Sequence, residues 1–275
     1  MASIRQSMSV LADAGLTFGS IKERTAAIRK ILLPLVIVGL VLWLWNAVVD
    51  AKMFPTVILP PPDEVWGVLK SQAGFMFGHA VKTFLECFFG FLIAALTGVG
   101  LATLMTVSKL AKEALFPNLV LFQLIPTIAL APLFVLWFGV GSESRLAYAM
   151  CLSLFPIVVA SSTGLMGTSP YFLRLCESLT ATKWQILWQV RFPFALPHIF
   201  TGLRIGLTLA VIGVVVGEFI TAQSGIGYLI SYASSGMETS LALAAILFLL
   251  GVGLILFVLL MVFEIVVSSF FSAKS

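Results

Sequence analysis

Long uninterrupted runs of apolar residues make up most of the chain, and short polar segments separate them. A helix needs about 20 mostly apolar residues to cross a bilayer. Six runs meet this length, so the pattern predicts an all-α polytopic membrane protein. The predicted spans are Ile31–Val49, Phe84–Val107, Phe116–Val140, Leu146–Met166, a fifth that begins at Pro197 or Ile205 and ends at Ile220, and Leu241–Phe263.

Composition agrees with the pattern of apolar runs. Hydrophobic residues make up 60% of the 275 positions, and charged residues only 10%. Soluble domains carry about a quarter charged residues, so an ordinary soluble protein and a disordered chain are both excluded. The apolar runs are continuous rather than alternating, which excludes a membrane β-barrel as well.

The distribution of Lys and Arg predicts the orientation. With the N-terminus placed in the cytoplasm, twelve of the 16 basic residues fall on the cytoplasmic side. Cytoplasmic loops of membrane proteins carry such an excess. We therefore expect a multi-pass membrane protein with both termini in the cytoplasm. The basic residues on the other side are Lys52, Lys70, Lys82 and Arg145.

The chain divides into a polar beginning and an apolar remainder. Residues 1–30 are expected to form a cytoplasmic segment without a signal peptide, because the first apolar run begins only at Ile31. The amphipathic stretch Ile21–Ile31 can lie on the membrane surface as an interfacial helix; the alternative is a solvated flank that only orients the first span. Residues 31–270 form the expected transmembrane domain.

The longest predicted internal loop, residues 167–199, is a candidate docking surface. Ser169 followed by proline is a favourable helix start, and apolar residues then recur at helical spacing, which predicts one or two short helices. Pro193 and Pro197 are expected to break or start helices. Trp184 has polar neighbours, a pattern typical of an aromatic anchor in an interface. The alternative is a helix packed on its own protein.

Several segments carry a resemblance to a known family. Val190-Arg191-Phe192-Pro193 is similar to the Ile-x-Leu-Pro end of a loop motif, Thr180 falls where that motif has Gly, and residues 174–176 replace its Glu-Ala-Ala start. The chain thereby resembles the permease subunit of a bacterial ABC importer, in the branch that serves nitrate, sulfonate, taurine, bicarbonate and vitamin-precursor importers. Other similar segments are LPPPDEVW (59–66), PTIALAPLFVLWFGVG (126–141), WQILWQVRFPFALPHIFTGLRIG (184–206), VVVGEFI (214–220) and GIGYLI (225–230).

The resemblance implies a type I ABC importer-like permease fold and a set of partners. These are a second copy of the chain, two ATP-binding cassette subunits and a periplasmic solute-binding protein that delivers a small solute. The chain contains no G-x-x-x-x-G-K-[ST] sequence, so Mg-ATP is expected in the partner ATPase. We expect the chain itself to be no enzyme and to hold no cofactor or metal.

The resemblance also implies that the 167–199 loop contains a coupling helix, which is seated in a groove of the ATPase. Trp184 is the expected anchor and Lys183 a charge at the rim. The predicted coupling residues are Thr180, Ala181, Thr182, Lys183, Trp184, Gln185, Leu187 and Pro193.

Ionisable and polar groups inside the spans are candidates for the translocation path or a gate. The more ordinary explanations are hydrogen bonds between helices and side chains that reach the interface. The GxxxG pattern Gly213–Gly217 permits close helix approach, either within one subunit or between two copies. The candidate path residues are Glu86, Gln123, Thr127, Trp137, Thr208 and Glu218.

The solute is not specified by the residues. No span interior is expected to contain Lys or Arg, which favours a neutral or weakly charged solute, or selection by the binding protein. An ion-coupled secondary transporter is the alternative function, since Pro126 and Pro132 can break the third span as in such proteins. An intramembrane enzyme is disfavoured, because His79 and His198 lie on opposite sides in the predicted topology and cannot share a metal.

Overall fold

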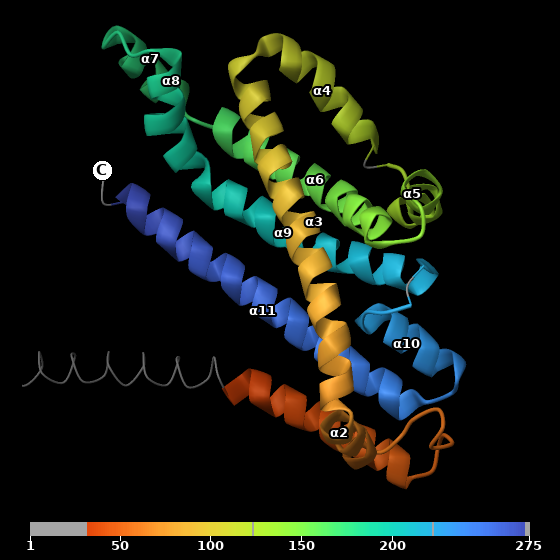
Figure 1. Cartoon of the computed structure of the whole chain (residues 1–275). Helices are drawn as coiled ribbons and strands as arrows, with labels where there is room; N and C mark the ends of the chain where they lie inside the picture. Colours follow the sequence, from red (N-terminus) through yellow and green to blue (C-terminus); the bar gives the residue numbers. More distant parts are fainter. Residues whose placement is uncertain (1–31, 123, 222, 273–275) are drawn as a thin grey trace, which may run out of the picture. The chain divides into compact units, whose positions relative to one another are not determined.

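The computed structural model describes residues 32–122, 124–221 and 223–272, and every regular element in these ranges is a helix or helical turn (Figure 1). The chain forms two compact units, one ending at Val65 and the other beginning at Trp66. The predicted interfacial helix around Ile21–Ile31 lies outside the described residues. This structure therefore concerns the membrane-spanning part of the chain.

The first unit contains an apolar helix, Leu32–Asp50, that is long enough to cross a membrane. After this helix, Lys52 adopts a left-handed conformation with φ of 51°. The indole Nε1 of Trp45 donates a hydrogen bond of 3.0 Å to the carbonyl of Pro60. This bond ties the proline-rich segment back to the helix. Helix α2, Pro62–Ser71, begins at the end of this segment.

Within the described residues, five helices are long and apolar enough to cross a membrane, or six spans result if one bent helix pair is counted as one span. This agrees with the expected number of about six. Four of the five lie in the second unit, and three of these are longer than a bilayer requires. The five are Leu32–Asp50, Ala73–Val107 (α3), Ser142–Met166 (α6), Lys183–Thr221 and Thr239–Phe271 within α11 (Thr239–Ser272).

The third predicted span is broken, as its two prolines allow, and it counts as a span only if the two bent halves are taken together. Helix α4, Lys109–Phe122, is followed by the 3₁₀ turn Thr127–Leu130 and by α5, Ala131–Phe138. The two halves are bent by 95°. Pro126 precedes the 3₁₀ turn and Pro132 lies in the first turn of α5. Proline has no N–H and fixes its φ angle, so it interrupts the helix here.

The fifth span is longer than predicted, and its prolines do not break it. It consists of α8 (Lys183–Ile186), a π turn (Leu187–Arg191) and α9 (Phe192–Thr221) in one continuous helix. Pro193 cannot donate to the carbonyl four residues earlier, and the π turn directly before it changes the hydrogen-bond spacing at this point. The segment that contains the predicted coupling residues Lys183, Trp184 and Gln185 is therefore continuous with the fifth span.

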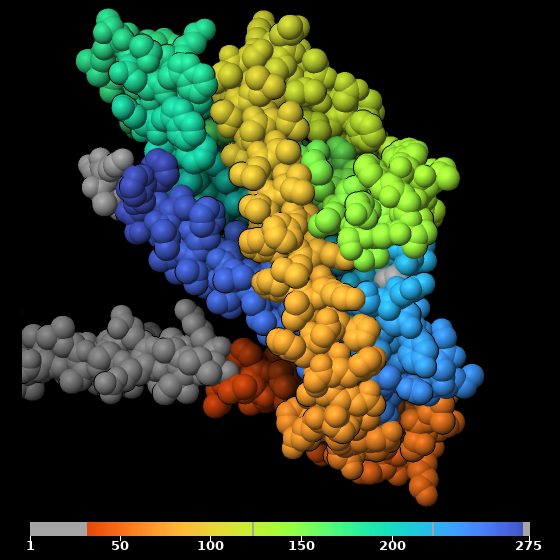
Figure 2. Space-filling view, viewed as in Figure 1, coloured from red at the N-terminus to blue at the C-terminus, as the bar shows by residue number. Residues whose placement is uncertain are grey.

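Helix α6 lies at the centre of the second unit, between α3 and α9 (Figure 1). In α6 and α9, half of the apolar stretch that can cross the membrane is buried, against 28% in α3 and 17% in α11. Figure 2 accordingly shows α3 and α11 on the viewed surface. In lipid, helices associate through close packing of small residues rather than through the hydrophobic effect.

The GxxxG pattern on α9 serves this packing within the subunit. A Cβ at Gly213 would lie 2.8 Å from Cα of Ala149, and a Cβ at Gly217 would lie 2.8 Å from Cγ of Arg145. Both neighbours belong to α6. The two glycines therefore let α9 approach α6, which decides one of the two interpretations left open by the sequence.

Candidate coupling surface and translocation residues

The 167–199 loop contains α7, Pro170–Ser178, and a sharp reversal after it. The N–H of Ala181 donates to the carbonyl of Cys176 and the N–H of Thr180 donates to that of Glu177, both at 3.0 Å. This is a Schellman motif, which places its turning residue in the left-handed region. Thr180 has φ of 58° there. Glycine suits this conformation best, and Thr180 is the position at which the resembled loop motif has Gly.

Helix α8 is fixed by a capping box. The Thr182 side chain accepts the N–H of Gln185 at 3.3 Å, and the Gln185 side chain accepts the N–H of Thr182 at 2.7 Å. These bonds satisfy donors at the helix start that no intrahelical carbonyl reaches. The Gln185 side chain therefore stabilises the start of α8.

The two faces of α8 differ. Trp184 is 64% exposed, whereas Leu187 is 1% exposed and anchors the helix from inside. The indole therefore projects from a helix that is held rigid on its other face. Of the predicted coupling residues, Thr180, Thr182, Lys183, Trp184 and Gln185 are exposed, Ala181 and Pro193 are half-buried, and Leu187 is buried.

A polar stripe on α3, made of His79, Thr83 and Glu86, contacts three other helices. The spacing of three to four residues puts the three side chains on one helix face. Of these, the sequence-based prediction named only Glu86 as a site residue. The stripe itself, at helical spacing in an apolar span, is the signal that could have found the other two.

Glu86 forms a buried ion pair with Arg145 of α6. Nε of Arg145 donates to Oε2 at 2.7 Å, and Nη2 donates to Oε1 at 2.6 Å. The hydroxyl of Ser142 donates to Oε1 at 2.9 Å. Both oxygens of the carboxylate and one edge of the guanidinium are therefore occupied. This two-point geometry is the strong form of an ion pair, and it ties α3 to α6.

Glu218 near the end of α9 is 1% exposed and accepts two hydrogen bonds. Thr83 Oγ1 donates at 2.7 Å, and the N–H of Gly227 donates at 2.6 Å. Gly227 lies in the first turn of α10, Ile226–Ser235. The carboxylate thus lies at the positive end of the α10 dipole, which stabilises a negative charge.

Two further bonds hold the start of α10 against α3. The N–H of Ile226 donates to Thr83 Oγ1 at 2.8 Å, and the N–H of Gly225 donates to Nδ1 of His79 at 3.0 Å. The His79 ring also stacks on Tyr228 with centroids 6.1 Å apart. The α9–α10 turn is therefore hydrogen-bonded to α3 through His79 and Thr83, which the sequence-based prediction did not assign to a site.

The other predicted path residues for which the structure describes a position do not join this network. Thr127 is exposed, and its carbonyl accepts the Tyr148 hydroxyl at 3.1 Å. Trp137 is exposed on α5. Thr208 is exposed on α9, and its hydroxyl donates to the carbonyl of Arg204 at 3.1 Å. Gln123 lies outside the described residues.

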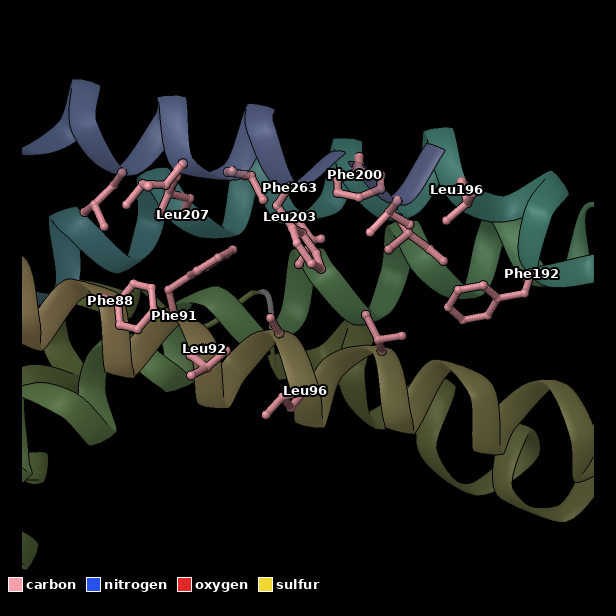
Figure 3. A pocket seen from close by; sticks show the side chains of 17 residues that line it. Phe88, Phe91, Leu92, Leu96, Phe192, Leu196, Phe200, Leu203, Leu207 and Phe263 are labelled. Carbon is pink, nitrogen blue, oxygen red and sulfur yellow. The ribbon is translucent and has the colours of Figure 1, made fainter. Parts of the chain in front are cut away.

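An apolar pocket of about 560 Å³ lies between α3, α9 and α11 (Figure 3). Its lining consists only of hydrocarbon side chains, among them Phe88, Leu92, Phe200, Leu203 and Phe263. Such a lining offers no hydrogen bond to a polar solute.

A second ion pair joins α9 to α11. Nη2 of Arg204 donates to Oε2 of Glu264 at 2.5 Å. Arg204 lies within the Lys183–Thr221 helix, which begins well before the predicted fifth span. The sequence-based prediction had started the fifth span near this residue, because it treated the prolines as helix breaks.

Metal binding has no support in the described ranges, which contain no group of three or more His, Cys, Asp and Glu side chains suited to an ion.

Comparisons with known proteins agree with this architecture. The family model "Binding-protein-dependent transport system inner membrane component" matches residues 88–270. A "Probable ABC transporter permease protein" of Haemophilus influenzae is 37% identical over 228 residues, which cover 83% of this chain and 93% of the relative. The taurine transport system permease protein of Escherichia coli is 30% identical over 246 residues, 87% of this chain and 90% of the relative.

A solved structure shares the fold. An inward-facing form of the MetNI methionine ABC transporter matches with a TM-score of 0.53 at 20% identity, over 71% of this chain and 93% of the matched chain. This confirms the expected type I importer-like permease fold. With the family match over most of the spanning helices, it identifies the chain as a multi-pass inner-membrane permease subunit that belongs to the binding-protein-dependent transport system inner membrane component family of ABC importers.

Proposed function

We propose that this chain forms the solute path of an ATP-driven importer and couples it to a separate ATPase through the 167–199 loop. The observation that carries the proposal is the exposed Trp184 on a capped helix that continues directly into a span. An exposed indole on a rigid base is a common anchor in protein interfaces.

The rod from Lys183 to Thr221 supplies the mechanism. ATP binding closes two ATPase subunits, and a groove on each carries α8 with it. Since α8 and α9 are continuous, this displacement reaches the outer end of α9, where Glu218 holds α10. Rigid-body movement of packed helices is an established way to alternate between two states.

Two copies of the chain are proposed to enclose the path, because one bundle of this size is packed around α6 at its centre. A two-fold arrangement presents one coupling loop to each of two ATPases. Those ATPases bind Mg-ATP, and a periplasmic binding protein delivers the solute to the opposite face. Both termini lie in the cytoplasm in this arrangement, as the Lys and Arg distribution favours.

The ion-coupled secondary transporter stays the second candidate because of one observation, the 95° break between α4 and the 3₁₀ turn. Broken helices near the midplane often bind coupling ions. However, the buried carboxylates of Glu86 and Glu218 are held by hydrogen bonds to other helices, and neither lies in the bent pair. ATP dependence of uptake in membrane vesicles separates the two functions.

The test of the coupling surface is Trp184→Ala in the full-length chain, purified from native membranes with whatever subunits accompany it. We expect a co-purifying ATPase with the natural chain and a several-fold loss of it with the variant. Trp66→Ala on α2, which also removes an exposed indole, is the control and should retain the ATPase. Equal recovery of the ATPase with both variants contradicts the assignment of Trp184.

A further inference from the structure

The apolar pocket between α3, α9 and α11 has a floor and two rims. Its floor is the face of α9 that carries Leu196, Phe200 and Leu203, and these side chains are buried. The rims are exposed side chains, among them Leu96 of α3 and Leu259 of α11. In Figure 2, atoms of α9 are visible between α3 and α11. The pocket is therefore a furrow that opens at the surface of the helix bundle.

The furrow runs along the helices for about the depth of one lipid leaflet. Its lining spans residues 88–99 of α3 and 256–267 of α11, and the end residues of each stretch are 11 positions apart. This separation is about 16 Å along a helix axis. A hydrocarbon core of about 30 Å gives each leaflet about 15 Å. Figure 3 shows Phe192 and Phe88 at opposite ends of the lining.

The Phe192 end of the furrow lies at the membrane boundary on the side of the 167–199 loop. Nη1 of Arg191 donates to the carbonyl of Leu165 at 3.3 Å, and α6 ends at Met166, so Phe192 is level with the end of that span. Trp188 is 51% exposed and packs on Phe192 with ring centroids 5.0 Å apart. Tryptophan is enriched at this level of a membrane, where its ring contacts acyl chains and its N–H faces the head groups.

The width of the furrow suits a hydrocarbon chain better than another helix. A volume of about 560 Å³ over about 16 Å of length corresponds to a channel about 7 Å across. A helix with its side chains is about 10–12 Å wide, whereas carbon atoms of neighbouring chains pack at about 4 Å. The lining consists of hydrocarbon side chains, so it accepts an apolar chain and disfavours a polar group.

We infer that this furrow is a lipid-binding site that holds one acyl chain of a phospholipid, with the head group beside Trp188. Lipid tails are as apolar as leucine, so no hydrophobic effect drives this binding. The chain is held by dispersion contacts with three helices, which exceed those that one flat helix face provides. The inference goes beyond the proposed function and does not depend on the ATPase.

The test uses phosphatidylethanolamine that carries a photoreactive diazirine on one acyl chain, either close to the ester or close to the methyl end. The full chain, with the subunits that co-purify with it, is reconstituted into vesicles of phosphatidylethanolamine and phosphatidylglycerol that contain the probe. The vesicles are then dissolved in detergent and the protein is washed before illumination, so that only retained lipid is labelled. Peptide mass spectrometry locates the adducts.

We expect the retained probe to label the lining several-fold more than Leu250 and Leu254, which are exposed on α11 outside the furrow. The diazirine close to the ester should label Phe192, and the diazirine close to the methyl end should label Phe88. This order follows from a head group beside Trp188.

Two substitutions fill the furrow. Ala95→Phe adds a ring to the half-buried wall of α3 and should lower the adducts on the lining several-fold. Leu96→Trp acts from the rim, where the native side chain is 69% exposed, and leaves the packed wall unchanged. Ala114→Phe is the matched control, because it places the same ring at an exposed position of α4 outside the furrow. This variant should be labelled like the natural chain.

Three results overturn the site. The first is loss of all label during the wash, or label on Leu250 and Leu254 as strong as on the lining. The second is equal labelling of the lining in the two filling variants and in Ala114→Phe. The third is a disulfide between two copies that carry Leu259→Cys, with the three native cysteines replaced by alanine, because a second copy then covers the furrow.

Discussion

The carboxylate of Glu218 on α9 accepts the N–H of Gly227 on α10 at 2.6 Å, nine residues further along the chain. The same carboxylate accepts the hydroxyl of Thr83 on α3. One buried side chain therefore joins three helices and caps the start of α10. Buried carboxylates are costly unless such donors surround them, and here two donors do.

Replacing Glu218 by Gln should destabilise this junction. The amide keeps the volume but loses the charge that the α10 dipole favours, and one of its ends can no longer accept. We expect the free energy of unfolding to fall by about 1–3 kcal/mol, measured as a lower midpoint of thermal unfolding in detergent. Glu238→Gln, at an exposed position, is the control. A Glu218→Gln midpoint equal to that of the control contradicts this role.

Gly225→Ala should destabilise the fold more than a glycine replacement that adds only backbone strain. Gly225 has φ of 114°, and an added Cβ would collide with the Glu218 carboxylate. Gly139 has φ of 80° but nothing within 4 Å of an added Cβ, so Gly139→Ala carries only the backbone strain of about 1–3 kcal/mol. We expect Gly225→Ala to lower the amount of folded protein well below Gly139→Ala in a fluorescence size-exclusion assay. Similar yields of the two variants would falsify the expected collision between the added Cβ and the Glu218 carboxylate.

Thr180→Gly should stabilise the coupling loop. A β-branched residue with φ of 58° is strained, and glycine removes that strain at some cost in backbone entropy. The expected net gain is about 1 kcal/mol. The neighbouring change Thr182→Ala removes the capping box and should cost about 1 kcal/mol. Hydrogen exchange of the α7–α8 amides should therefore slow in Thr180→Gly and quicken in Thr182→Ala. Changes of the same sign in both variants contradict these two structural roles.

The Glu86–Arg145 pair should behave as a closed structural unit. Glu86→Ala leaves a buried guanidinium without its partner, and we expect a loss of about 3–5 kcal/mol. The double change Glu86→Met with Arg145→Met removes both charges and should recover much of that loss. Thermal unfolding of the single and double variants checks this. A double variant less stable than Glu86→Ala would show that the pair itself contributes net stability.

Much of the fold follows from local rules that the sequence contains. In lipid, each backbone N–H and C=O must be bonded within its own helix, so a run of 20 apolar residues is a span in almost any context. Trp184 on a short helix of the 167–199 loop follows equally from helical spacing and a start signal. The prolines did not follow a local rule. Pro126 and Pro132 accompany the 95° break, whereas Pro193 and Pro197 lie within a continuous helix. A π turn shortly before Pro193 changes the hydrogen-bond spacing there.

The sequence by itself therefore determined the class of protein, the number of apolar runs and the presence of short helices in the 167–199 loop. Only the tertiary structure decided which polar groups in the spans meet. Glu86 and Arg145 are 59 residues apart in the chain, and Arg204 and Glu264 are 60 apart. Whether such a pair shares two hydrogen bonds, as the first does, or one, as the second does, depends on how its two helices pack against each other. The sequence does not reveal this, because apolar residues are distributed nearly uniformly around a helix that lipid surrounds.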